Sequence, residues 1–248
     1  MILIIPSIDI KDGKTVRVVQ GIPELDCPSY GNDPVEMAMI WRAENARLIH
    51  VVDFDCSQKK SHCNFHIIHE ICNSVIIPVE FGGGINSLED AKEILNLGVF
   101  RIVIGSLAIT NPSEFEKIIS EIGTAKVSAA IDFIDDEVVI EGRSKKTGIS
   151  PLEFAKRLKN LGAERCIVTD VSRNGMLTGA NLQKSMEIAS ETGLKVTHSG
   201  GIHGFEDLIE LNKFSNIGID SVIIGRALYE NKFSCQKIWR VAEHGLFS

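Results

Sequence analysis

The sequence of 248 residues lacks the features that mark secreted, membrane-spanning and nucleic-acid-binding proteins. Its apolar N-terminus reaches Asp9 too early for a signal peptide, and no apolar run approaches the roughly 20 residues of a membrane span. The net charge of −7, from 33 acidic and 26 basic side chains, argues against the basic face that nucleic acids require. We therefore expect a cytoplasmic protein with no membrane or nucleic-acid partner.

The sequence also lacks Cys-x-x-Cys pairs, and several of its six cysteines lie in apolar runs, where small buried thiols are common. We expect reduced thiols at Cys27, Cys56, Cys63, Cys72, Cys166 and Cys235. One segment concentrates possible metal ligands, but their spacing matches no established zinc pattern: Cys56, His62, Cys63, His66 and His69. An ordinary loop and helix explain this segment, so no metal is predicted.

What the sequence does contain is a regular alternation of strand-like and helix-like segments. The predicted strands are Ile2–Ile8, Leu48–Phe54, Val75–Phe81, Arg101–Gly105, Val127–Asp132, Arg165–Asp170, Leu194–Ser199 and Ser221–Gly225. Most are apolar throughout, which is typical of parallel strands covered on both faces. Predicted helices between them include Pro34–Asn45, Leu88–Leu97, Pro112–Ile122, Pro151–Leu161 and Leu182–Thr192. Ser150 is the predicted N-cap of the helix at Pro151. The alternation predicts a parallel sheet.

An internal repeat favours a closed barrel over an open sheet. Motifs at the strand ends of the first half recur in the second: Ser7-Ile8-Asp9 as Ala130-Ile131-Asp132, Val51-Val52-Asp53 as Val168-Thr169-Asp170, Gly83-Gly84-Ile85 as Gly200-Gly201-Ile202, and Val103-Ile104-Gly105 as Ile223-Ile224-Gly225. Four βα units followed by four more predict a single (β/α)8 TIM barrel spanning residues 1–248, with half-barrels of approximately 1–123 and 124–248.

Glycine clusters follow four of the predicted strands. Bare backbone N–H groups in such loops can approach an anion closely, and a following helix favours its charge. The clusters contain Gly82, Gly83, Gly84, Gly105 and Ser106 in the first half, and Ser199, Gly200, Gly201, Gly225 and Arg226 in the second. Because the repeat pairs them, they predict two phosphate sites and a small-molecule substrate with a phosphate at each end.

Carboxylates end the first strand of each half, after wholly apolar runs. At the carboxyl face of a barrel, Asp9 and Asp132 therefore read as a catalytic pair, although either could instead cap a loop. For Asp53 and Asp170, structural hydrogen bonds to loop N–H groups are at least as good an explanation. The loop from Val171 to Gly179 is expected to form a shaped turn over the site. His50 and His198 fit supporting or core positions better than catalytic ones.

Taken in order, these motifs resemble the phosphoribosylformimino-5-aminoimidazole carboxamide ribotide isomerase family of histidine biosynthesis. The resemblance runs essentially end to end, through Ile5–Asp9, Val16–Gly21, His50–Asp53, Gly82–Ile85, Ile104–Ser106, Ala130–Asp132, Thr169–Arg173 and Ser199–Gly201. The sister family, imidazole glycerol phosphate synthase, shares the two aspartates. Arg17, where the sister has lysine, and the following Gln20-Gly21 match the isomerase form.

The resemblance implies an intramolecular aldose–ketose isomerase that performs an Amadori rearrangement without a cofactor. It implies that Asp9 is the base, that Asp132 or Asp170 is the acid and that Thr169 lies beside the reacting ribose. Arg17, Arg143, Asn174 and Gly179 are expected to contact substrate, and a monomer is expected.

Three positions depart from the usual pattern of this family. Asn174 replaces an aspartate that is one proposed acid, Asn86 replaces an arginine after the glycine cluster, and Arg143 replaces a tryptophan that packs on the substrate. The guanidinium of Arg143 could stack in that tryptophan's place. The departures leave two alternatives: a catalytically weakened phosphate-binding or regulatory paralogue, and a bifunctional isomerase that also accepts phosphoribosyl anthranilate.

Overall fold

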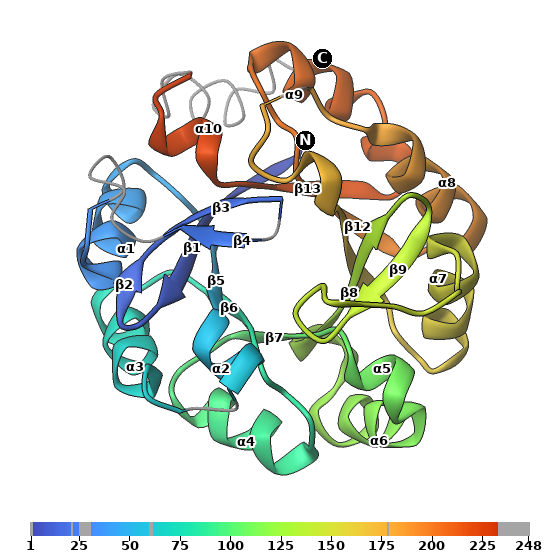
Figure 1. Ribbon diagram of the computed structural model, residues 1–248, viewed down its shortest axis with the longest axis horizontal. Coiled ribbons are helices and arrows are strands. Elements are labelled where there is room, and N and C mark those ends of the chain that lie inside the picture. The colour runs from blue at the N-terminus through green and yellow to red at the C-terminus, as the bar shows by residue number, and fades with distance from the viewer. Residues whose placement is uncertain (1, 21, 25–30, 60–61, 178, 233–248) are drawn as a thin grey trace.

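A computed structural model describes residues 2–20, 22–24, 31–59, 62–177 and 179–232 of the chain. Eight parallel strands form a ring at its centre and helices surround them (Figure 1). The barrel strands are β1 (Leu3–Lys11), β5 (Ile49–Asp53), β6 (Val79–Gly82), β7 (Arg101–Ile104), β8 (Val127–Ile134), β11 (Arg165–Asp170), β12 (Lys195–Ser199) and β13 (Ile219–Ile224). The predicted TIM barrel is confirmed; the boundary between the half-barrels stays a prediction.

The barrel closes because every barrel strand has a parallel partner on each side. Strand β1 pairs with both β13 and β5, with Ile5 opposite Ile223 and Ser7 opposite His50. The two halves join where β7 pairs with β8. All eight strands consequently end at the same face, which brings the strand-end motifs together.

Alternate side chains of these strands point into the barrel. An apolar layer there consists of Ile5, Leu48, Val103, Ile167 and Ile223. A polar group inside the same ring includes Glu80, Arg101, Arg165 and Asp220, in which Arg101 Nη1 lies 3.4 Å from Glu80 Oε2 and Arg165 Nη1 donates to Asp220 Oδ1 at 2.7 Å. The inside of the barrel is thus a packed core beneath the mouth.

The larger, apolar core lies between the ring and the helices. The longer helices are α1 (Pro34–Ala43), α3 (Phe65–Ser74), α4 (Leu88–Asn96), α6 (Pro112–Ile122), α7 (Pro151–Asn160), α8 (Leu182–Thr192) and α9 (Phe205–Asn212). Ser150 caps α7 by accepting a hydrogen bond from Glu153 N at 3.2 Å, so the predicted N-cap is confirmed. Asp33 and Ser87 cap α1 and α4 in the same way.

One strand prediction was wrong at its start. The predicted strand at Val75–Phe81 begins only at Val79, because α3 runs to Ser74 and Val75 is its C-cap. Ile76, with a φ of +24° and an exposed side chain, lies in the turn between the two elements. An apolar run alone does not distinguish the end of a helix, a turn and a buried strand.

Several short elements were not predicted, and many of them lie near the mouth. They are strands β2 (Lys14–Thr15), β3 (Arg17–Val19), β4 (Ile22–Glu24), β9 (Glu137–Ile140) and β10 (Lys145–Lys146), α-helices α2 (Phe54–Lys59), α5 (Leu107–Thr110) and α10 (Arg226–Tyr229), and 3-10 helices η2 (Thr124–Lys126), η3 (Val171–Arg173) and η4 (Ser215–Ile217). The β3–β4 ribbon crosses the mouth in Figure 1. Gln20 docks it on the loop after β11 by donating its N–H to Asn174 O at 2.8 Å.

In the segment with possible metal ligands, the described residues form α2, a turn at Cys63 and Asn64, and α3, while residues 60 and 61 lie outside the description. Within the residues that the structure describes, no three His, Cys, Asp or Glu side chains are grouped to hold a metal ion. Cys56, Cys63, Cys72 and Cys166 are free thiols, as expected. Gly21, Cys27 and Cys235 lie outside the described residues. No described helix is long and apolar enough to span a membrane.

Candidate active site

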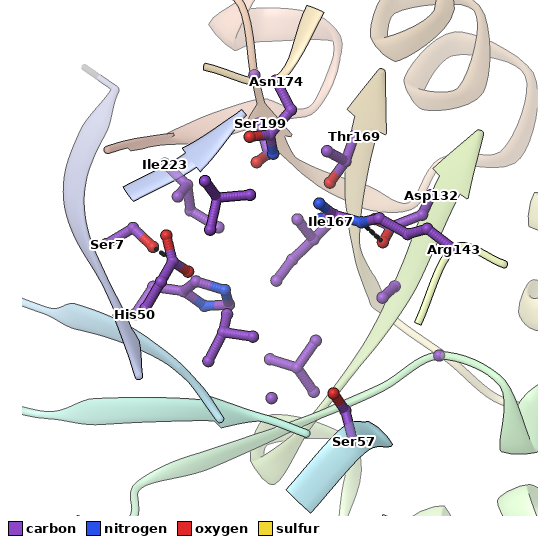
Figure 2. A pocket seen from close by; sticks show the side chains of 18 of the residues that line it. Ser7, His50, Ser57, Asp132, Arg143, Ile167, Thr169, Asn174, Ser199 and Ile223 are labelled. Atoms are coloured by element: carbon purple, nitrogen blue, oxygen red, sulfur yellow. Dashed lines mark hydrogen bonds and ion pairs between the residues drawn. The ribbon is translucent and has the colours of Figure 1, made fainter. Parts of the chain in front are cut away.

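A pocket of about 820 Å³ opens at the carboxyl ends of the barrel strands. It brings together most of the predicted site residues, namely Asp9, Gly82, Gly83, Gly84, Gly105, Ser106, Asp132, Arg143, Thr169, Asn174, Ser199, Gly200, Gly201, Gly225 and Arg226. Ser7 and His50 lie on one side of the pocket in Figure 2, and Asp132 with Arg143 lies across from them. Both halves of the repeat therefore contribute to one cavity.

Three predicted site residues are outside the described lining of this pocket: Arg17, Asp170 and Gly179. Arg17 Nε donates to Glu24 Oε2 at 2.7 Å within the β3–β4 ribbon. Asp170 accepts hydrogen bonds from Ser172 N at 3.1 Å and Asn181 Nδ2 at 2.9 Å, which shape the loop after β11. Gly179 O accepts from Arg173 Nη1 at 3.2 Å. Their roles in catalysis or binding stay predictions.

Asp9 lies near the end of β1, in a half-buried position that faces the pocket. The pKa of Asp9 is raised from 3.8 to about 6. Burial causes the rise, and the charges of His50 and Arg143 and the hydroxyl of Ser7 offset part of it. Ser7 Oγ lies 3.4 Å from Asp9 Oδ1. A carboxyl group with a pKa near 6 is ionised at neutral pH and still basic enough to take a proton.

Asp132 on β8 is held by Arg143. The guanidinium Nε of Arg143 donates to Asp132 Oδ2 at 2.8 Å, and about one fifth of each side chain is exposed. The buried Nη1 of Arg143 has no hydrogen-bond partner among the described residues. Thr169 on β11 is in register with Asp132 and is also buried at the pocket wall. This side of the pocket thus combines a carboxylate, an unused guanidinium donor and a hydroxyl.

The glycine loops adopt backbone conformations that require glycine. The φ angles of Gly83, Gly84, Gly200 and Gly201 are +142°, +65°, +97° and +80°. A Cβ atom on Gly84 would lie 2.5 Å from Cys56 Sγ, and one on Gly201 would lie 2.6 Å from Gly179 O. Close packing beneath the loops therefore leaves their backbone N–H groups as the surface available to an anion.

The two halves place different side chains beside these glycine loops. In the first half, Ser106 Oγ accepts a hydrogen bond from Glu141 N at 2.8 Å. In the second half, Arg226 begins α10, and its side chain donates to Gly175 O and Glu230 Oε1. Asn86, which stands where the family usually has arginine, donates its Nδ2 to Gly84 O at 2.6 Å. Of these three side chains, the cationic one, Arg226, is consequently beside the glycine loops of the second half.

The two strand histidines have different environments. His198 is buried, contacts Ser185 Oγ at 2.9 Å, and its pKa falls to about 4 because of burial, as suits a neutral core residue. His50 instead lines the pocket, with its Nδ1 2.9 Å from Glu80 Oε1. Sequence reasoning missed the pocket positions of Ser7 and Tyr229. Ser7 was detectable, because it lies two residues before Asp9 and hence on the same face of β1.

Comparison with known proteins identifies the group to which this barrel is related. A family model described as "Histidine biosynthesis protein" matches residues 3–234. A protein of Chloroherpeton thalassium is 43% identical over 244 residues, covering 98% of this chain and 93% of that protein. A protein of Salinibacter ruber is 38% identical over 240 residues, covering 96% and 93%. Both are named 1-(5-phosphoribosyl)-5-((5-phosphoribosylamino)methylideneamino)imidazole-4-carboxamide isomerase.

Proposed function

The chain belongs to the histidine biosynthesis protein family, and on that premise we propose that it is the aldose–ketose isomerase of that pathway. It converts the phosphoribosylformimino aminoaldose into the corresponding phosphoribulosylformimino aminoketose by an Amadori rearrangement. The substrate is a phosphorylated small molecule, consistent with the names of the relatives. No observation favours the regulatory paralogue or the anthranilate-accepting isomerase.

The observation that best supports this assignment to the pocket is the placement of Asp9 and Asp132. They come from β1 and β8, the equivalent strands of the two predicted half-barrels, and both line the same cavity. Glycine loops of both halves line it as well. A substrate with a phosphate at each end would then place its central ribose between the two carboxyl groups. This arrangement suits proton transfer at both sides of one sugar.

The proposed reaction begins when Asp132, as the general acid, gives a proton to the ribose ring oxygen. The C1′–O bond then breaks, and the nitrogen lone pair forms the C1′ iminium ion. Asp9 removes the proton from C2′, and the C–H electron pair moves into the iminium to give an enolamine. Return of a proton to C1′ and loss of the hydroxyl proton give the aminoketose. The iminium is the electron sink, so this route needs no cofactor.

Asn174 is the departure that most directly concerns this route. Its amide cannot donate a proton at a useful pKa, so the acid must come from another group, which we assign to Asp132. We expect wild-type protein to turn over, and Asn174→Asp to change kcat by less than about tenfold, because the pocket already contains an acid. Steady-state turnover of both proteins with the aminoaldose measures this.

Asn174→Ala is the matched control, because it removes the amide without adding a carboxyl group. A negligible wild-type rate that Asn174→Asp raises by several orders of magnitude would favour the weakened paralogue. Direct assay of phosphoribosyl anthranilate tests the bifunctional alternative.

We infer that the enzyme acts as a monomer. We also infer that it works in the cytoplasm without a nucleic-acid or membrane partner. Light scattering on the purified protein tests the first inference, and subunits that dimerise at working concentrations would contradict it.

A further inference from the structure

A row of polar residues crosses four neighbouring strands inside the barrel. Ser7 on β1 is in register with His50 on β5, His50 with Glu80 on β6, and Glu80 with Arg101 on β7. Side chains at directly opposite positions of adjacent strands lie next to each other on the same face. The row therefore leads from Asp9, which contacts Ser7 at the mouth, to a carboxylate deep inside the barrel.

Glu80 is the buried centre of this row. Its side chain is 1% exposed, and it contacts His50 Nδ1 at 2.9 Å through Oε1 and Arg101 Nη1 at 3.4 Å through Oε2. Burial by itself would raise the pKa of Glu80, but the hydrogen bond and charge of His50, together with Arg101 and Arg165, lower it overall. Glu80 is accordingly an ionised carboxylate that can only accept hydrogen bonds.

An ionised Glu80 determines which nitrogen of the His50 ring donates a hydrogen bond to it. Because the carboxylate only accepts, the Nδ1 atom of His50 must carry a proton, and Nε2 is the nitrogen left for the pocket. The charged groups that act on Asp9 are His50 from β5 and Arg143 from the β9–β10 loop, and the pKa of Asp9 is lower than burial alone would make it.

We propose that Glu80 is a positioning residue for the isomerisation: it accepts a hydrogen bond from His50 Nδ1 and so holds the imidazole in place at the pocket, with Nε2 left for the pocket. This proposal rests on the proposed function, in which Asp9 is the base. Glu80 itself lies outside the described lining of the pocket and acts only through His50.

The test is the pH dependence of kcat/KM for Glu80→Gln, which keeps the shape of the side chain and removes its charge. When the His50 ring is no longer held by the carboxylate, its interaction with Asp9 weakens, and Asp9 holds its proton to higher pH. The acid limb should rise by about one pH unit, lowering kcat/KM about fivefold at pH 6 and less than about twofold at pH 8.5. His50→Gln should give the same shift, and Glu80→Gln should add nothing in the His50→Gln background.

Asp220→Asn is the matched control, since it removes another inward carboxylate that is paired with an arginine, Arg165. It should lower the unfolding temperature and leave the acid limb in place. The proposal would be overturned if folded Glu80→Gln kept the wild-type acid limb of kcat/KM. It would also be overturned if Asp220→Asn shifted that limb as far as Glu80→Gln does. Loss of turnover in Asp9→Asn is a separate result, whose absence would count against the proposed function instead.

A second measurement uses only the wild-type protein and so does not depend on the variant folding. In ¹⁵N-resolved NMR spectra of the histidine rings, His50 should carry a proton on Nδ1, the nitrogen that contacts Glu80. A neutral ring protonated only at Nε2 would contradict the proposal, because such a ring cannot donate from Nδ1 to Glu80.

Discussion

Replacing Asp9 with asparagine is expected to lower kcat by about 10³-fold or more, because the amide cannot take the C2′ proton. Substrate binding should change far less, since the glycine loops that are proposed to hold the phosphates are untouched. Steady-state kinetics and direct substrate titration of the variant separate the two effects. Asp135→Asn, which alters an exposed carboxylate in the β8–β9 turn, is the matched control and should keep wild-type kinetics.

The Asp9→Asn substitution should not destabilise the protein. The pKa of Asp9 is raised on folding from 3.8 to about 6, so its ionised form costs folding free energy above pH 6, and this cost disappears below pH 3.8. Asp9→Asn should therefore match or exceed wild-type stability at pH 8 and lose that advantage at acid pH. Denaturant unfolding at both pH values tests this. A variant that is inactive because it is unfolded, or one that keeps full activity, would contradict the assignment.

Replacing Gly84 with alanine is expected to lower stability by about 2 kcal/mol or more and to raise KM about tenfold or more. Its φ of +65° disfavours a side chain, and the added Cβ would lie 2.5 Å from Cys56 Sγ and 2.6 Å from Cys56 O. The loop must shift to remove these collisions, which displaces the N–H groups that are proposed to hold one phosphate. Thermal unfolding and steady-state kinetics measure the two effects.

Gly193→Ala separates backbone strain from displacement of the loop. Gly193 has a nearly identical φ of +64°, ends α8 and would place its Cβ where no atom lies within 4 Å. It should show a smaller loss of stability and an unchanged KM. An equal rise of KM in both variants, or none in Gly84→Ala, would argue against a phosphate site at this loop.

The fold was predictable because parallel barrel strands are covered on both faces and so appear as short apolar runs. The repeat then placed Asp9 opposite Asp132 and put the glycine loops at one mouth, where the structure has them. Strand starts were less certain, as Val79 shows, because apolar residues at the end of α3 and in the following turn look like strand.

The finer features of the pocket depend on register, which no local pattern encodes. Glu80 lies in an apolar run, and its contact with His50 arises only when β5 and β6 pair with these residues opposite each other. Arg143 was expected to contact the substrate, which stays a prediction. Its contact with Asp132 was not foreseen, because it depends on the loop between β9 and β10, where the φ of Arg143 is +73°. Long-range pairing and irregular loops therefore set the electrostatics of the site.

The pH dependence of wild-type turnover tests the central claim most directly. The purified protein is assayed with the aminoaldose, coupled to the next enzyme of the pathway, and kcat/KM is followed from acid to neutral pH. We predict robust turnover with an acid limb near pH 6, where Asp9 gains its proton. Tight binding without conversion, or turnover that stays constant well below pH 6, would contradict the account.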